Sequence, residues 1–195
     1  MMNKLKQILL LATIALCSNS LKAQSFDLSS LDNITSMINK GGNNTKVVGL
    51  IGGAMDGIKS EIGNSNSSFA PKILGQVANL GSMIPALKSG NINTNLITKA
   101  ISTIKTLIAA NRLKNMLGQG SLLGKSSQLS SNVGVLQQGL GMLGGGSKVD
   151  KISSLLNVVN KKSPKLEKDG LFGKLASKAI SKKLGSSLDM LGGLI

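Results

Sequence analysis

This 195-residue chain has no histidine, tryptophan or tyrosine, a single cysteine and only three phenylalanines. Imidazole, thiol and phenol groups are common general bases, nucleophiles and acids of enzymes, and imidazole and thiolate are strong ligands of transition metals. A lone cysteine also excludes a disulfide framework within the chain. The sequence therefore predicts a protein that is not an enzyme, holds no cofactor or metal, and is stabilised by an aliphatic core.

Two short motifs nevertheless have the spacing of catalytic or nucleotide-binding elements. The run from Ser102 to Lys105 resembles the S-x-x-K motif of penicillin-binding enzymes, but Lys88-Ser89-Gly90 precedes it, which is the wrong order for that family. Gly139, Gly141 and Gly144 form a G-x-G-x-x-G pattern that ends a predicted helix, whereas a dinucleotide site needs a preceding strand. We interpret both as chance matches. The enzyme alternative would require an essential carboxylate or serine.

The N-terminus has the three parts of a secretory signal peptide. Lys4 and Lys6 precede the apolar run 8–17, and Ala23 supplies a small residue for cleavage before Gln24. A retained anchor is disfavoured because a bilayer span needs about 20 apolar residues. Lipidation of Cys17 is disfavoured because the residue before it, Leu16, is bulky. We expect residues 1–23 to be removed and the protein to be exported to the periplasm, the outer envelope or the extracellular space.

The exported chain is strongly basic. Loss of Lys4, Lys6 and Lys22 leaves 20 basic residues against 8 acidic ones, a net charge of +12. The 22 lysines against one arginine suggest a bacterial source with an AT-rich genome. The charge favours anionic partners. Specific nucleic-acid binding is disfavoured because it uses arginines and stacking aromatics, which this chain almost lacks.

Hydrophobic periodicity predicts an all-α protein, and no stretch alternates as a half-buried strand does. We expect one domain over 24–195, an irregular bundle of about six or seven short amphipathic helices. Pro85 should break a helix near Ile84. A charged linker, 161–170, should precede a C-terminal amphipathic helix, 171–191. The expected helices are 26–40, 46–62, 71–87, 95–117, 128–143, 148–160 and 171–191.

The segment 95–117 has the clearest helical period and is predicted to be central. Ile97, Ile101, Ile104 and Ile108 recur at spacings of four, three and four residues, so they lie on one face. Asn93 or Thr94 can cap its start, and Gly118 can end it. The stripe loses phase after Ala110, which predicts a bend or a change of packing partner there.

The second predicted helix carries a ridge of glycines. Gly49, Gly53 and Gly57 are spaced by four, which permits close approach of another backbone. Charged residues interrupt the segment, so a membrane dimer is disfavoured. We expect this ridge to pack tightly inside the bundle. In an alternative, the ridge and the seam from Leu129 to Leu143 would pack against another chain.

The C-terminal helix is the best candidate for contact with a membrane surface. Its predicted apolar arc contains Phe172, Leu175, Ala176, Ala179, Ile180 and Leu184. Lys174, Lys178 and Lys182 lie together on the opposite side, and Lys183 can extend its amine from the apolar side. The opening sequence GLFGKL resembles short cationic membrane-active peptides over six residues. The alternative is that the apolar face docks on the bundle and the lysines are merely solvated.

These observations give two functional hypotheses. In the first, a non-enzymatic envelope protein binds anionic lipid or envelope polymer through Phe172, Lys174, Lys178, Lys182 and Lys183. In the second, the chain is an assembly subunit or homo-oligomer that packs through its glycine-rich helices.

Overall fold

A computed structural model describes residues 25–63, 65–91, 93–142, 144–168 and 170–195. The predicted signal peptide, 1–23, lies outside these residues. The described residues contain helices and no strand, which confirms the all-α prediction for this part of the chain. The elements are α2 (Ser29–Asn39), α3 (Asn44–Ile62), α4 (Ala70–Ser82), α5 (Ile84–Lys88), α6 (Thr94–Gly118), α7 (Ser126–Met142), α8 (Ser147–Lys162), the 3₁₀ helix η1 (Ser163–Glu167) and α9 (Leu171–Gly192).

Helix boundaries follow the local signals of the sequence. The Asn43 side chain accepts hydrogen bonds from the N–H groups of Thr45 and Lys46 at the start of α3. Asn93 caps α6 in the same way through the N–H of Asn95. Helix α4 ends at Ser82, and the short α5 restarts with Pro85 in its first turn, which confirms the predicted break.

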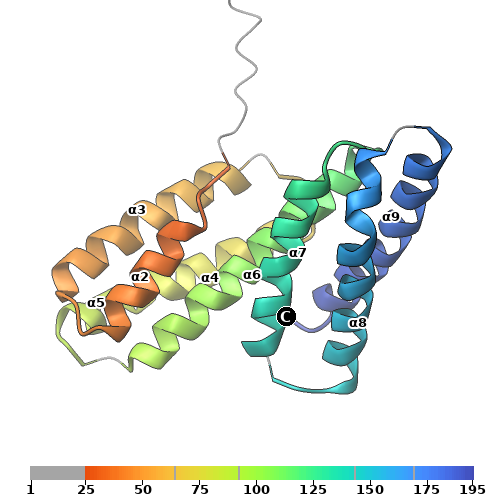
Figure 1. The fold of residues 1–195 in the computed structure, drawn as a ribbon. Helices are drawn as coiled ribbons and strands as arrows, with labels where there is room; N and C mark the ends of the chain where they lie inside the picture. The colour runs from red at the N-terminus through yellow and green to blue at the C-terminus, as the bar shows by residue number, and fades with distance from the viewer. Residues whose placement is uncertain (1–24, 64, 92, 143, 169) are drawn as a thin grey trace, which may run out of the picture.

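Helix α6 lies at the centre of the fold, with α2–α5 on one side and α7–α9 on the other (Figure 1). It contacts α2, α4, α7 and α9. All residues from Thr106 to Asn111 are buried, so the middle of α6 is covered on every side. The predicted isoleucine stripe is buried. More than one face of α6 is already packed from Thr106, before the stripe loses phase after Ala110.

Polar residues of α6 fasten the N-terminal segment to this core. Arg112 forms an ion pair with Glu61 of α3 at 2.7 Å and donates a hydrogen bond to the backbone carbonyl of Phe26. The Glu61 carboxylate also accepts the N–H of Phe26 at 2.6 Å. Asn111, fully enclosed, accepts a hydrogen bond from the hydroxyl of Ser65 at 2.9 Å. These contacts satisfy polar groups that the sequence placed on the apolar face of α6.

The start of α2 carries the clearest pKa perturbation. The Ser29 hydroxyl and then the Ser29 N–H donate to the Asp27 carboxylate, which lowers the pKa of that group below its ordinary value. Asp27 is fully exposed, so this local turn positions the chain at the beginning of α2 and buries no charge.

The predicted glycine ridge is only partly used inside the chain. A Cβ at Gly49 or Gly53 would meet nothing within 4 Å among the described residues, so no helix packs closely there. Gly53 follows Ile51 by two residues, about 200° around the helix, and Ile51 is what faces the core. The expected tight packing at these two glycines is therefore wrong. Gly57 does allow close approach, but of the Phe26 ring rather than of another helix.

The seam of α7 is also an internal feature. Leu129, Val133, Leu136 and Leu140 are buried within the chain. They are therefore not available as a surface for another chain, as the assembly hypothesis required. Leu143 lies outside the described residues.

Candidate anionic-surface site

The turn before α9 is fixed by two glycines. Gly170 has φ 78° and ψ −149°, a conformation that residues with a side chain rarely adopt. A Cβ at Gly173 would lie 2.0 Å from the carbonyl oxygen of Lys168 and 3.0 Å from Leu123 Cδ2. The preceding segment is also packed, because Leu166 of η1 is buried. The first turn of α9 is therefore held tightly against its neighbours, although 161–170 was expected to be a linker.

One side of α9 packs against the rest of the protein. The buried positions include Ala176, Ile180 and Leu184 from the predicted apolar arc, and they continue to Leu188 and Leu191. Ser177 lies on the same side, where its hydroxyl accepts the N–H of Leu122 at 3.3 Å. Ala176, Ile180 and Leu184 therefore dock on the bundle, as the alternative to membrane contact expected.

Two arc residues, Phe172 and Leu175, stay in solvent at the first turn of α9 together with Leu171, whereas the arc residue Ala179 is half-buried. Leu171, Phe172 and Leu175 are 70%, 75% and 57% exposed. They are not covered because the buried side extends only about 40° from Ile180 in their direction, as far as Ala176, whereas Phe172 and Leu175 lie about 80° and 140° away. The structure therefore docks part of the predicted arc and leaves an exposed tip at the start of α9, which we define as Leu171, Phe172 and Leu175.

The four predicted lysines follow this tip along α9, and Lys174 and Lys178 lie about 160° and 120° around the helix from Phe172. Lys174, Lys178, Lys182 and Lys183 are all exposed, and none forms an ion pair within the described residues. Asp189, the acidic residue of α9, instead pairs with Lys114 of α6 at 3.2 Å. The exposed face of α9 thus combines large apolar side chains with uncompensated positive charge.

The lysines border two different hollows. Lys174 and Lys178 line a shallow depression with Ser121 and Leu123 of the α6–α7 connection. Lys182 and Lys183 line a groove between α8 and α9, together with Lys151, Leu155, Ser186 and Met190. Lys151 and Leu155 were not predicted, because their position beside α9 depends on the antiparallel packing of α8.

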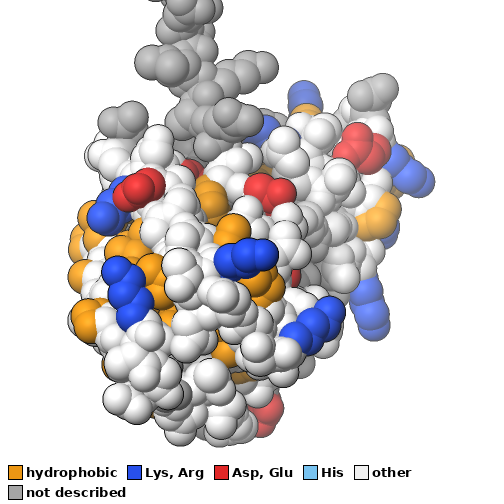
Figure 2. Space-filling model, turned by 90° about the vertical axis from the view of Figure 1, so that its left-hand side faces the viewer, with side chains coloured by type: hydrophobic (Ala, Val, Ile, Leu, Met, Phe, Trp, Pro, Cys, Tyr) orange, Lys and Arg blue, Asp and Glu red, His pale blue; other side chains and the backbone are white. Residues whose placement is uncertain are grey.

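The opposite end of the molecule has a more mixed surface. Figure 2 shows acidic and basic side chains together there, among neutral groups and separate apolar patches. Helix α3 exposes Gly49, Leu50 and Gly53 on one side of the helix. This surface lacks the segregation of charge that distinguishes α9.

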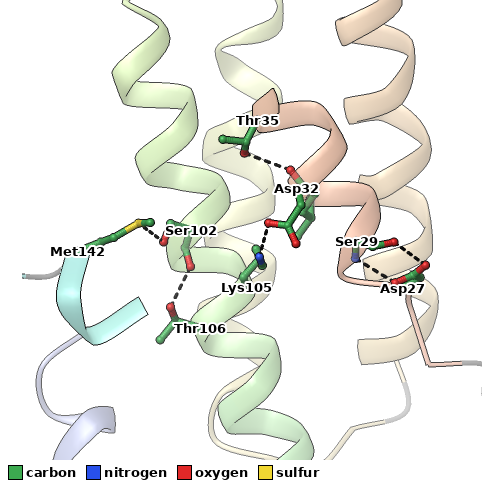
Figure 3. A network of polar contacts seen from close by, with 9 residues as sticks. Asp27, Ser29, Asp32, Thr35, Ser102, Lys105, Thr106 and Met142 are labelled. Carbon is green, nitrogen blue, oxygen red and sulfur yellow. Dashed lines mark hydrogen bonds and ion pairs between the residues drawn. The ribbon is translucent and has the colours of Figure 1, made fainter. Parts of the chain in front are cut away.

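A polar network joins α2, α6 and α7 but does not form a serine–lysine pair (Figure 3). The Ser102 hydroxyl donates to Met142 Sδ at 2.7 Å, whereas Lys105 forms an ion pair with Asp32. The Thr106 hydroxyl donates to the carbonyl of Ser102 at 2.8 Å. The two residues of the S-x-x-K match therefore contact different partners.

The described part of the chain shows neither a cluster of metal-ligand residues nor a helix that could span a bilayer. It contains no cluster of three or more acidic, cysteine or histidine residues that could bind a metal ion. It also contains no helix with both the length and the hydropathy needed to cross a bilayer. Comparison with protein-family models, curated proteins and solved structures finds no match for this chain.

Proposed function

We propose that this chain is an exported, non-enzymatic protein of the bacterial cell envelope that binds an anionic membrane surface or envelope polymer through α9. The observation that carries the proposal is the exposed tip of Leu171, Phe172 and Leu175 on the same helix as four exposed lysines that form no ion pair within the described residues. Export is supported by the signal-peptide pattern in 1–23.

The forces available at this surface suit reversible binding. A lysine near an anionic surface contributes about 1 kcal/mol. Burial of a large apolar side chain contributes about 1.5–3 kcal/mol when complete, and less for shallow insertion at the headgroup level. Four lysines with a three-residue tip therefore give binding that salt can reverse, since surface charges are screened beyond about 8 Å at physiological ionic strength.

The direct test is co-sedimentation of the protein, without its signal peptide, with anionic and neutral vesicles. We expect K174Q/K178Q/K182Q to weaken binding to anionic vesicles about 100-fold, from three contributions of about 1 kcal/mol. The matched control K40Q/K46Q/K88Q removes the same charge from exposed positions outside α9 and should change binding less than threefold. Equal losses in the two variants would show an effect of net charge alone. Equal binding of the wild type to both vesicles would contradict the proposal.

The tip is tested separately. L171Q/F172Q should reduce vesicle binding without changing thermal stability, since both side chains are largely exposed. If anionic polysaccharide competes with vesicles for the wild type but vesicle binding is insensitive to L171Q/F172Q, the partner is polymer rather than lipid.

A second candidate function, assembly through α3, is favoured by one observation. Gly49 and Gly53 are open to another backbone, and Leu50 between them is 44% exposed. Light scattering after size exclusion should then find an oligomer that persists at high salt and dissociates on G53L. A monomer at all salt concentrations would exclude this function.

A further inference from the structure

The groove between α8 and α9 has the composition of a site for an amphiphilic anion. Lys151 and Leu155 of α8 line one wall, and Lys182, Lys183, Ser186 and Met190 of α9 line the other. Three lysines therefore line an open groove that also presents two apolar side chains. Ammonium groups are hydrogen-bond donors only, so they require an acceptor or water.

The groove is held open by the packing beneath it. Ile152, Leu156 and Val159 of α8 are buried, as are Ile180, Leu184 and Leu188 of α9, and the two helices contact each other along this seam. The Ser186 hydroxyl is already engaged, because it donates to the carbonyl of Lys182 at 3.1 Å. The lysines are thus the donors that this site offers to a ligand.

No carboxylate balances the charge of the groove. Its lining contains no acidic residue, and none of its three lysines forms an ion pair within the described residues. Asp189, one residue before Met190, is held by Lys114 of α6. Asp150 lies next to Lys151 in sequence but about 100° away around α8. An anion entering here would meet three positive charges and no negative one.

The groove and the exposed tip lie on one flank of α9. Phe172, Leu175, Ala179, Lys183, Ser186 and Met190 follow one another at spacings of three or four residues, which places them in a line along the helix. Lys151, Leu155, Val158 and Lys162 form a similar line on α8. A bilayer that receives Phe172 would therefore also face the opening of the groove.

We propose that this groove binds the phosphate of an anionic phospholipid, with Lys151, Lys182 and Lys183 on the phosphate and Leu155 and Met190 against the apolar part of the same lipid. This inference rests on the proposed function and specifies its ligand. The apolar walls distinguish a lipid from inorganic phosphate, which would gain nothing from them. The three ammonium groups distinguish an anionic head group from a zwitterionic one, which carries its own cation.

The test uses a short-chain phosphatidylglycerol below its micelle concentration, added to the isotopically labelled protein without its signal peptide. We expect saturable amide shifts at Lys151, Leu155, Ser186 and Met190. K151Q should weaken binding about fivefold and K151Q/K183Q about 25-fold, since each lysine contributes about 1 kcal/mol. K148Q and K161Q are matched controls on α8 outside the groove and should stay within twofold. Lys151 is exposed, so the melting temperature of K151Q should be unchanged.

Three outcomes would overturn the inference. If phosphatidylcholine of the same chain length produces the same amide shifts, the groove recognises only the apolar part of the lipid and not its charge. Inorganic phosphate could bind as tightly as the lipid, which would show an ordinary anion patch. K148Q could weaken binding as much as K151Q, which would show a delocalised charge effect.

Vesicle binding separates failure of this inference from failure of the proposed function. If the wild type does not bind anionic vesicles, the proposed function fails. If the wild type binds them, K174Q/K178Q, which leaves the groove intact, does not, and K151Q binds as the wild type does, the surface proposal stands and the groove is not the lipid site.

Discussion

At the scale of single residues, Gly139 shows how closely two helices meet. A Cβ built at Gly139 of α7 would lie 1.7 Å from Oγ1 and 2.8 Å from Cβ of Thr106 on α6. The steric clash involves the whole Thr106 side chain, whose hydroxyl also donates a hydrogen bond to the carbonyl of Ser102. Rotation of one bond therefore cannot relieve it, and α6 and α7 would have to move apart.

We predict that G139A lowers the free energy of unfolding by about 3 kcal/mol through overpacking. Urea denaturation measures the change. G134A, at an open position of the same helix, is the matched control and should be neutral or stabilising by up to about 1 kcal/mol, because alanine favours the helix. T106A/G139A should recover much of the loss. Equal effects of G139A and G134A would show that the helices are not in close contact there.

The contact between Gly139 and Thr106 could not be predicted from the sequence. Gly139 stood out in the sequence only as part of a G-x-G-x-x-G match, and the position of that match at the end of a predicted helix argued against a nucleotide site. Its actual role depends on Thr106, 33 residues earlier, and on the crossing of two helices. A single sequence carries no signal of such a contact.

At the scale of elements, α9 combines a docked side with an exposed tip. Its apolar arc was predictable from helical spacing, but which part of the arc would be covered was not. That choice depends on where α8 and the α6–α7 connection lie. The same limit applied to α3, where spacing identified the glycine ridge but did not reveal that Gly49 and Gly53 face outward.

We predict that substitutions separate the two sides of α9. I180A removes a fully buried side chain and should lower the free energy of unfolding by about 2–5 kcal/mol. L175A removes a side chain that is more than half exposed and should change it by no more than about 0.5 kcal/mol. Urea unfolding of both variants provides the measurement. Comparable destabilisation by the two would mean that Leu175 is covered in solution.

Helix α6 was the most predictable element, including its end at Gly118, but the partners of its second half were not predictable. The isoleucine spacing and the Asn93 cap located its start, and the long apolar run indicated its central position. The sequence did not reveal that α6 has partners on several sides from Thr106 to Asn111. The bonds of Asn111 to Ser65 and of Arg112 to Glu61 explain why polar residues are accommodated on this helix.

At the scale of the whole molecule, α6 is shared by two groups of helices, α2–α5 on one side and α7–α9 on the other (Figure 1). It contacts α2 and α4 from one group and α7 and α9 from the other. Neither group can lose its packing without exposing apolar residues of α6. The shared packing of α6 is a physical reason to expect a single domain, and the cooperativity of unfolding tests that expectation.

We predict one cooperative unfolding transition. In calorimetry the van't Hoff and calorimetric enthalpies should agree. Amides from Thr106 to Asn111 should exchange with solvent only through global unfolding, since this stretch is buried on all sides. Two separate transitions, or faster exchange in one half of α6, would show that the two groups of helices unfold independently.

The aromatic residues have very different surroundings. Phe69 is buried, Phe26 is half-buried over Gly57, and Phe172 is exposed at the start of α9. Because the chain has no tryptophan and no tyrosine, the protein is nearly silent in fluorescence excited at 295 nm. A tryptophan introduced as F172W would therefore emit without background from a single position at the start of α9. The wavelength of its emission maximum would report whether that position is in water or in lipid.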